Sequence, residues 1–168
     1  GRFFASPQFS IDMRILTPLL VHSLAAVIAA LAALPAQAQM DAAQMAAARQ
    51  KAAVCFACHG PNGNSANPAF PILAGQSWRY TYIQLKDFKE GRRSDPAMSP
   101  MVADLSREDM IALGNFFAAQ KPAPIAFKAD GARVEAGRKI SDAVLCPMCH
   151  LGGFVGQNEI PKVAGQYP

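Results

Sequence analysis

The residues most able to do chemistry in this sequence are cysteines and histidines, and they occur in one pattern that is used twice. In each copy two cysteines stand three positions apart and a histidine follows the second. The members are Cys55, Cys58 and His59 in the first copy and Cys146, Cys149 and His150 in the second. Cys-x-x-Cys-His is the attachment pattern of a c-type haem. The two thiols can form thioethers to the two vinyl groups of a porphyrin, and the histidine can then ligate the iron. We therefore predict two covalently bound haem c groups with their iron.

Other chemistries of cysteine and histidine fit this sequence less well. A structural zinc site usually needs four ligands close together, but the two copies begin 91 positions apart, at Cys55 and Cys146. A thioredoxin-like dithiol needs a βαβ pattern, and no strand-like alternation surrounds either copy. Disulfides in an exported protein are the third alternative. All four cysteines of the chain belong to the two copies, so none remains for a second chemistry.

The N-terminal residues have the pattern of an export signal. Residues 15–34 are nearly all apolar, Arg14 precedes them, and the small residues Ala36 and Ala38 follow. This order predicts a secretory signal peptide cleaved after Ala38, with Met13 as the natural start. About twenty apolar residues can also span a bilayer, so an uncleaved anchor is the competing interpretation. We assign residues 1–38 to upstream residues plus this signal peptide.

The charge of the chain gives little evidence for a nucleic-acid or membrane partner. Removing residues 1–38 changes the formal net charge only from +4 to +3, and the propionates of two haem groups would offset it. We therefore predict no nucleic-acid partner and interpret most charges as ordinary solvated surface. Arg92 and Arg93 form one local basic pair against which a propionate or an acidic redox partner could sit.

The pattern of apolar, capping and turn residues predicts helices joined by loops. Good helix formers at 41–54 follow a candidate cap, Asp41, and lead into the first cysteine motif. A capping box at Ser106 opens another helix. The expected order is a helix at 41–54, turns at 60–68, a helix from the cap Ser77 to 90, an extended loop at 92–105, a helix at 106–120, a linker at 121–129, and a helix at 131–145 capped by Asp130.

An internal repeat divides the sequence. Residues 71–76 (Pro-Ile-Leu-Ala-Gly-Gln) are matched by residues 161–166 (Pro-Lys-Val-Ala-Gly-Gln), about 90 positions later. We expect a first haem domain at 39–120, a linker at 121–129, and the N-terminal half of a second haem domain at 130–168. The second copy has no counterpart of residues 77–120, so we interpret the sequence as truncated.

These motifs together resemble the dihaem cytochrome c4 family. The resemblance covers residues 39–168 and is carried by both Cys-x-x-Cys-His motifs and by four segments of the first copy: residues 70–76, residues 82–85, Met98, and the helix start at Leu105 and Ser106. It implies an all-α fold of tandem class I cytochrome c domains, the second incomplete here. It also implies a periplasmic electron carrier, not an enzyme and without catalytic residues, whose partners are an electron donor and a terminal oxidase.

The resemblance also implies an axial ligand set. His59 and Met98 would hold the first iron and His150 the second. A thioether as the sixth ligand gives a centre suited to electron transfer. The family places this methionine eight residues before the helix-capping serine, which favours Met98 and leaves Met101 as the alternative. The imidazoles should donate hydrogen bonds to backbone carbonyls, and the resemblance implies those of Pro71 and Pro161.

Two alternative functions share most of these residues. The chain could be the cytochrome subunit of a larger dehydrogenase or oxidase complex, with peripheral membrane association. It could instead be a dihaem peroxidase-type enzyme with one open iron. No residue of this sequence serves as the sixth ligand of the second haem, since Met148 lies inside the second motif. A peroxidase, however, would also need an acid–base residue near the open iron.

Overall fold

The computed structural model describes residues 40–168, and this part of the chain is helical and contains no named strand. The predicted signal peptide and the cleavage site after Ala38 lie outside these residues. The all-α fold expected from the sequence is confirmed. The elements are α2 (Ala42–Ala52), α3 (Phe56–His59), α4 (Trp78–Lys89), α5 (Met98–Val102), α6 (Arg107–Ala118), α7 (Gly131–Ala143) and α8 (Cys146–His150), with 3-10 turns at Ala53–Cys55, Pro61–Gly63 and Gly152–Phe154.

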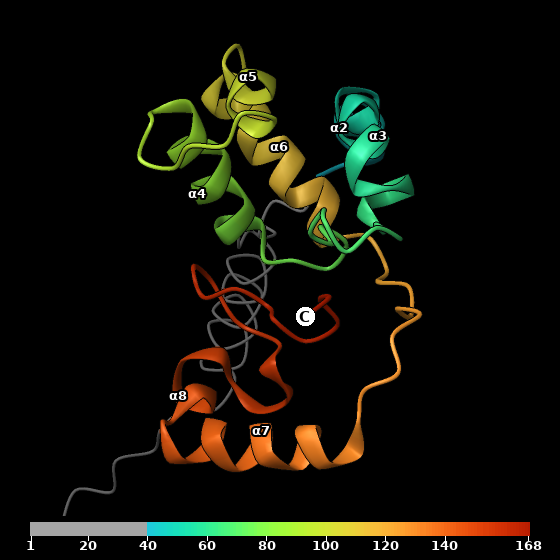
Figure 1. Cartoon of the computed structure of the whole chain (residues 1–168). Helices are drawn as coiled ribbons and strands as arrows, with labels where there is room; N and C mark the ends of the chain where they lie inside the picture. The colour runs from blue at the N-terminus through green and yellow to red at the C-terminus, as the bar shows by residue number, and fades with distance from the viewer. Residues whose placement is uncertain (1–39) are drawn as a thin grey trace, which may run out of the picture. The chain divides into compact units, whose positions relative to one another are not determined.

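Helix α6 is the centre of the hydrophobic core and lies between α4 and α2 (Figure 1). Its inner side carries Leu113, Phe116 and Phe117, each 2% exposed. The small residues Ala48 and Ala52 of α2 are buried in the same cluster, which lets α2 approach α6 closely. The last turn of α2 therefore has a fixed position, and the first cysteine motif follows directly from it.

Side-chain hydrogen bonds cap the N-termini of three helices, as the sequence predicts. Asp41 accepts from the backbone N–H of Gln44 and forms a full capping box at the start of α2. Ser106 forms a second capping box with Asp109 at the start of α6. Asp130 caps α7 with its side chain. Each cap satisfies backbone N–H groups that have no partner inside the helix.

Residues 92–105 differ from the extended loop that the sequence predicts, because they contain helix α5. The carboxylate of Asp95 accepts hydrogen bonds from the backbone N–H groups of Ala97 (2.8 Å) and Met98 (2.9 Å), where the helix begins. Pro100 lies in the first turn of α5, where the missing N–H of proline costs little. This proline is therefore compatible with a short helix.

Ser77 precedes α4 as expected, but its side chain does not cap that helix. Its hydroxyl instead donates to the backbone carbonyl of Asn158, 81 residues later. The predicted basic pair also has partners within the chain. Arg92 forms ion pairs with Asp87 and Glu90, and its side chain stays exposed.

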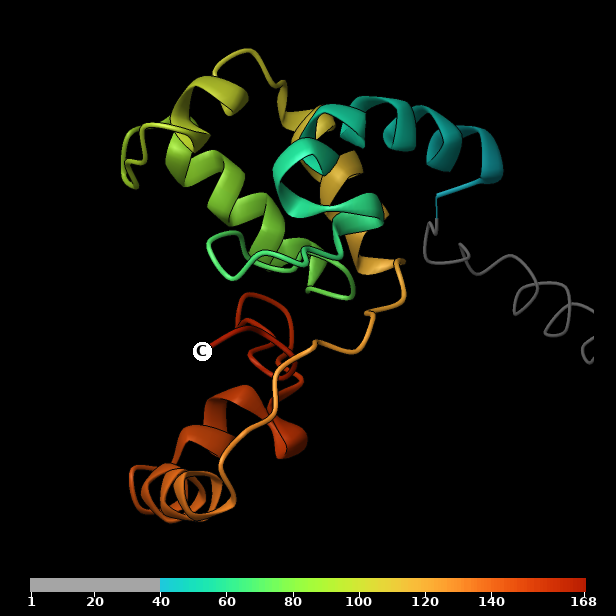
Figure 2. The same ribbon diagram turned by 45° about the vertical axis from the view of Figure 1, so that its right-hand side comes forward.

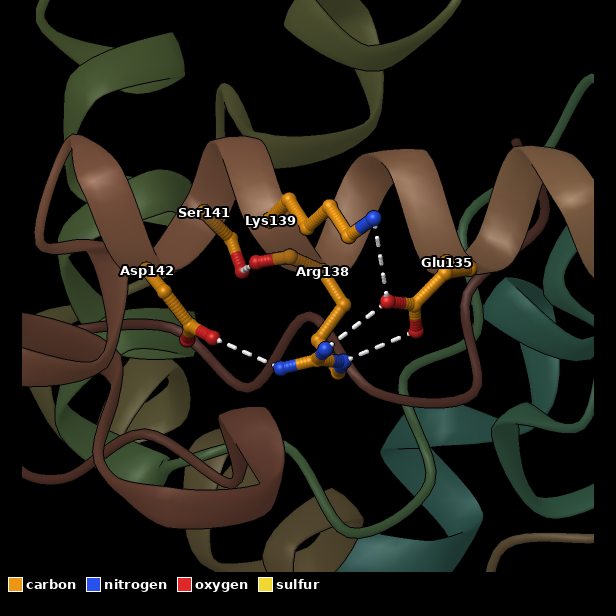
Figure 3. A network of polar contacts seen from close by, with 5 residues as sticks. All are labelled: Glu135, Arg138, Lys139, Ser141 and Asp142. Atoms are coloured by element: carbon orange, nitrogen blue, oxygen red, sulfur yellow. Dashed lines mark hydrogen bonds and ion pairs between the residues drawn. The ribbon is translucent and has the colours of Figure 1, made fainter.

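Helix α7 is held by ion pairs along its own surface. The guanidinium of Arg138 contacts Glu135 at 2.8 Å and Asp142 at 3.1 Å, and Lys139 also approaches Glu135 (Figure 3). The hydrogen bonds from Arg138 hold the pKa of the Glu135 carboxyl below its usual range. Every residue of α7 is exposed except Ser141, which is half-buried in its last turn, and pairs at spacings of three and four stabilise such a helix. Within residues 40–168 no helix has the length and apolar character that a membrane crossing requires.

Candidate haem attachment sites

The first motif lies where α2 passes through a 3-10 turn into α3. Cys55 ends the 3-10 turn and is half-buried, and Cys58 is exposed one turn later. Residues three positions apart in a helical turn lie on the same side of it, so both thiols can reach one porphyrin edge. His59 ends α3 and is 5% exposed.

The orientation of the His59 imidazole is set by a backbone carbonyl. Its Nδ1 atom lies 2.8 Å from the carbonyl oxygen of Pro71. A carbonyl oxygen only accepts, so Nδ1 must carry the proton and Nε2 must be the ring nitrogen with a free lone pair. The ring of Phe70 stands edge-on to the imidazole, with centroids 6.3 Å apart. The hydrogen bond to Pro71 expected from the resemblance is confirmed.

The second motif repeats this arrangement. Cys146 and His150 are the first and last residues of α8; both are half-buried, and Cys149 is exposed. Nδ1 of His150 lies 2.8 Å from the carbonyl oxygen of Pro161, the same distance as in the first motif. The second imidazole therefore also presents Nε2 as its unprotonated nitrogen.

The thiols are free, as attachment to vinyl groups requires. All four cysteines lack a disulfide partner. Among residues 40–168 no group of three or more His, Cys, Asp or Glu side chains could hold a metal ion by itself. Burial raises the pKa of the Cys55 thiol. Each donor set consists of two free thiols and one imidazole, and both sets fit a covalently attached haem.

The two candidate methionines differ in burial. Met98 is half-buried at the start of α5, whereas Met101 is 46% exposed. A ligand must turn its thioether inward, away from water. The burial therefore favours the same methionine as the sequence spacing does.

No role was predicted from the sequence for two glutamines that join the two motifs in space. Gln76 and Gln166 hold equivalent positions in the repeat, and each hydrogen-bonds to the backbone of the other copy. The repeat does place a glutamine at the same position in both copies. It did not predict a contact between the copies, because no short-range sequence pattern shows that these two loops lie side by side.

Comparison with known proteins identifies the family of this chain. The cytochrome c family model matches residues 43–120. Cytochrome c4 of Pseudomonas aeruginosa is 38% identical over 133 residues, which cover 75% of this chain and 66% of that protein. The thiosulfate dehydrogenase electron acceptor of Thiomonas intermedia is 37% identical and covers 74% of this chain and 62% of its own length. The chain thus spans about two thirds of the length of the curated relatives it matches.

A solved structure gives the same result for the fold. Reduced recombinant cytochrome c4 from Pseudomonas stutzeri superimposes with a TM-score of 0.65 at 35% sequence identity, covering 71% of each chain. That structure, the relatives at 36–38% identity, the paired Cys-x-x-Cys-His motifs and the all-α fold give one conclusion. The chain belongs to the dihaem cytochrome c4 family and binds haem c covalently.

Proposed function

We propose that this protein carries single electrons between redox proteins in the periplasm. The observation that carries the proposal is the repeated donor set: two free thiols beside an imidazole whose Nδ1 is fixed by a proline carbonyl at 2.8 Å, once in each copy. Haem c, when bound, supplies an iron that changes between Fe(III) and Fe(II) by one electron. The protein binds the group, fixes its ligands and excludes water.

The residues have separate roles in this proposal. The cysteines at 55, 58, 146 and 149 hold the two groups covalently. His59 and Met98 would hold the first iron, and His150 would hold the second. A histidine together with a methionine would give the first iron a relatively high potential suited to electron transfer. Cytochrome c4 proteins are electron carriers rather than enzymes, so no catalytic residue is assigned and the peroxidase-type alternative is set aside.

The partners we propose are an electron donor and a terminal oxidase. The alternative, a cytochrome that serves a dehydrogenase complex, is favoured by one observation: a relative with 37% identity is named as the electron acceptor of thiosulfate dehydrogenase. The rate of electron transfer with each partner distinguishes the two classes. The reduced protein should be oxidised rapidly by an isolated terminal oxidase. Under the alternative, the oxidised protein should be reduced rapidly by a thiosulfate-oxidising enzyme supplied with thiosulfate.

Carbon monoxide binding to the reduced protein tests the electron-carrier function at the first haem. Carbon monoxide needs an open iron position, so the first haem should bind none when His59 and Met98 both ligate. The visible absorption change is measured against total haem, and a Met98→Ala variant is the positive control. If the first haem of the unmodified protein binds the gas stoichiometrically, its iron is open, and a ligand-binding or enzymatic function replaces the electron-carrier proposal.

A further inference from the structure

Two glutamines connect the surroundings of the two motif histidines in a reciprocal way. The side-chain amide of Gln76 donates from Nε2 to the carbonyl oxygen of Lys162 (2.9 Å), and its Oε1 accepts from the backbone N–H of Lys162 (2.8 Å). Gln166 does the same to Ile72, with distances of 2.7 Å for the donated bond and 2.9 Å for the accepted one. Each glutamine therefore holds both backbone polar groups of one residue in the other copy. We call these two contacts the glutamine clasps.

Each clasp includes a hydrogen bond to the peptide group that orients a motif histidine. The N–H of Ile72 and the carbonyl of Pro71 belong to one peptide unit, and this carbonyl accepts from Nδ1 of His59. In the same way the N–H of Lys162 shares a peptide unit with the carbonyl that accepts from His150. A continuous chain of hydrogen bonds thus runs from each glutamine to the histidine of the opposite copy.

The arrangement is that of a two-fold interface, in which one residue contacts a second and their counterparts repeat the contact in reverse. Figure 2 shows the C-terminal segment, in red, beside the loop that precedes α4. Gln76 is 6% exposed and Ile72 is 4% exposed. Their hydrogen bonds to the half-buried Lys162 and Gln166 are therefore partly shielded from competing water, and such shielding makes a hydrogen bond stronger.

The electronic effect of a clasp has a definite sign. A peptide group whose N–H donates becomes a better acceptor at its carbonyl, because hydrogen bonds in a chain polarise one another. A stronger acceptor at Pro71 withdraws the Nδ1 proton of His59 and makes the imidazole a more basic ligand. A more basic ligand stabilises Fe(III) over Fe(II), and hydrogen bonding around the ligands is one of the levers on haem potential. An intact clasp therefore lowers the potential of the haem in the opposite copy.

We propose that Gln76 and Gln166 are positioning residues that act crosswise, each setting the potential of the haem held by the other copy. Gln166 acts on the haem of His59 through Ile72 and Pro71, and Gln76 acts on the haem of His150 through Lys162 and Pro161. The inference rests on the proposed electron-carrier function. It deepens that function, because each copy supplies a residue that sets the potential of the haem in the other copy.

The test is the reduction potential of each haem in a Gln166→Leu variant, followed by proton NMR during stepwise reduction. Leucine has a similar size but no hydrogen-bonding groups. We expect the one-electron equilibrium constant of the first haem to shift about threefold toward Fe(II), which is a rise of about 28 mV at 59 mV per tenfold change. The second haem should move less. Gln76→Leu should give the reverse assignment, with the larger rise at the second haem.

The sign distinguishes this role from simple adhesion between the two copies. If the clasps only hold the segments together, their loss admits water near the haem. Water favours the more highly charged Fe(III) state and lowers the potential. A lowered potential, or equal shifts at both haems, overturns the proposal. Gln50→Leu, at an exposed residue of α2, is the matched control and should leave both potentials unchanged.

Two further measurements keep the test decisive. Gln166→Asn retains the amide but shortens its reach by one carbon, so it should raise the first potential as Leu does, even if Leu disturbs folding. In the unmodified protein, a scalar coupling across the hydrogen bond should link the Ile72 amide nitrogen to the Gln166 side-chain carbonyl carbon. Its absence contradicts the clasp itself. Unshifted potentials in a chain that still carries two haems and transfers electrons refute this inference alone, whereas a chain without haem refutes the proposed function.

Discussion

Gly60 and Leu151 directly follow the histidines of the two motifs and have nearly the same backbone conformation. Gly60 has φ 74° and ψ 170°, and Leu151 has φ 62° and ψ 170°. This region of backbone space is populated almost exclusively by glycine, because a side chain there clashes with its own backbone. The second copy therefore holds a strained leucine at the position where the first copy has glycine.

Leu151→Gly should relieve this strain and stabilise the haem-loaded protein by about 1 kcal/mol. The matched change in the first copy, Gly60→Ala, should destabilise it, since a Cβ atom there would lie 2.2 Å from the carbonyl oxygen of Asn64. Guanidinium unfolding followed by circular dichroism measures both. A Leu151→Gly variant less stable than the unmodified protein would show that the leucine side chain contributes more by packing than it costs in strain.

The crossing of α4 and α6 depends on a missing side chain at Gly114. A Cβ atom at this position would lie 2.6 Å from the carbonyl oxygen of Trp78 in α4. Gly114→Ala should therefore force the helices apart and cost about 1 to 3 kcal/mol of stability. Gly137→Ala in α7 is the control, because nothing lies within 4 Å of its Cβ position.

In the control, alanine replaces a flexible residue within a helix, so Gly137→Ala should stabilise the protein by about 0.5 to 1 kcal/mol. The two variants make the same chemical change in two helices and should shift the unfolding midpoint in opposite directions. Equal shifts would mean that the close approach at Trp78 is not what excludes a side chain from position 114.

Asp109 should make stability depend on pH at the acidic end. Hydrogen bonds from Lys51, and then from the backbone of Ser106, hold the pKa of its carboxyl below the usual value. A group whose folded pKa is lowered stabilises the fold above its unfolded pKa of about 3.9 and loses that contribution as pH falls through the folded pKa. The stability difference between the unmodified protein and Asp109→Asn should therefore be present at neutral pH and shrink as the pH falls below the unfolded pKa of about 3.9.

Unfolding curves measured from neutral to acidic pH test this dependence. Asp104→Asn, at an exposed residue before the same helix, is the matched control for the loss of a surface carboxylate. A difference for Asp109→Asn that does not change with pH would contradict the role assigned to the carboxylate.

Substituting Met98 and Met101 one at a time shows which methionine ligates the first iron. Met98→Ala should open the first iron, so that the reduced variant binds carbon monoxide at one additional haem. Met101→Ala removes a side chain that is 46% exposed and should leave binding unchanged. Visible absorption against total haem gives the count. If Met101→Ala opens the iron instead, the half-buried position of Met98 reflects packing alone.

The double variant Cys55→Ala, Cys58→Ala, produced without haem, should be largely unfolded. The first copy has about 80 residues, and a unit of this size buries only a modest apolar core and generally needs a covalent or cofactor staple. The measurement is far-ultraviolet circular dichroism beside the haem-loaded protein. A native-like helical spectrum without haem would show that the Leu113, Phe116 and Phe117 cluster suffices for folding.

Spacing of residues along the chain was enough to predict the attachment chemistry and most of the helices. Two thiols and an imidazole within five residues act through local geometry, and so do caps such as Asp41 and Ser106, whose hydrogen bonds span three positions. The repeat indicated two equivalent units. The family resemblance supplied the proline carbonyls that the histidines contact. The assignment of axial ligands stays a prediction.

What depends on the path of the whole chain was decided only by the tertiary structure. Helix α5 occupies a segment that was predicted as an extended loop, and the Asp95 carboxylate accepts from the N–H groups of Ala97 and Met98 where this helix begins. The clasps of Gln76 and Gln166 join residues 86 and 94 positions apart. No local pattern specifies such a pairing, because a glutamine in a loop can hydrogen-bond to any backbone group that the fold brings to it. The sequence by itself therefore determined which groups bind haem, and the packing of the two copies determined that each copy also supports the histidine of the other.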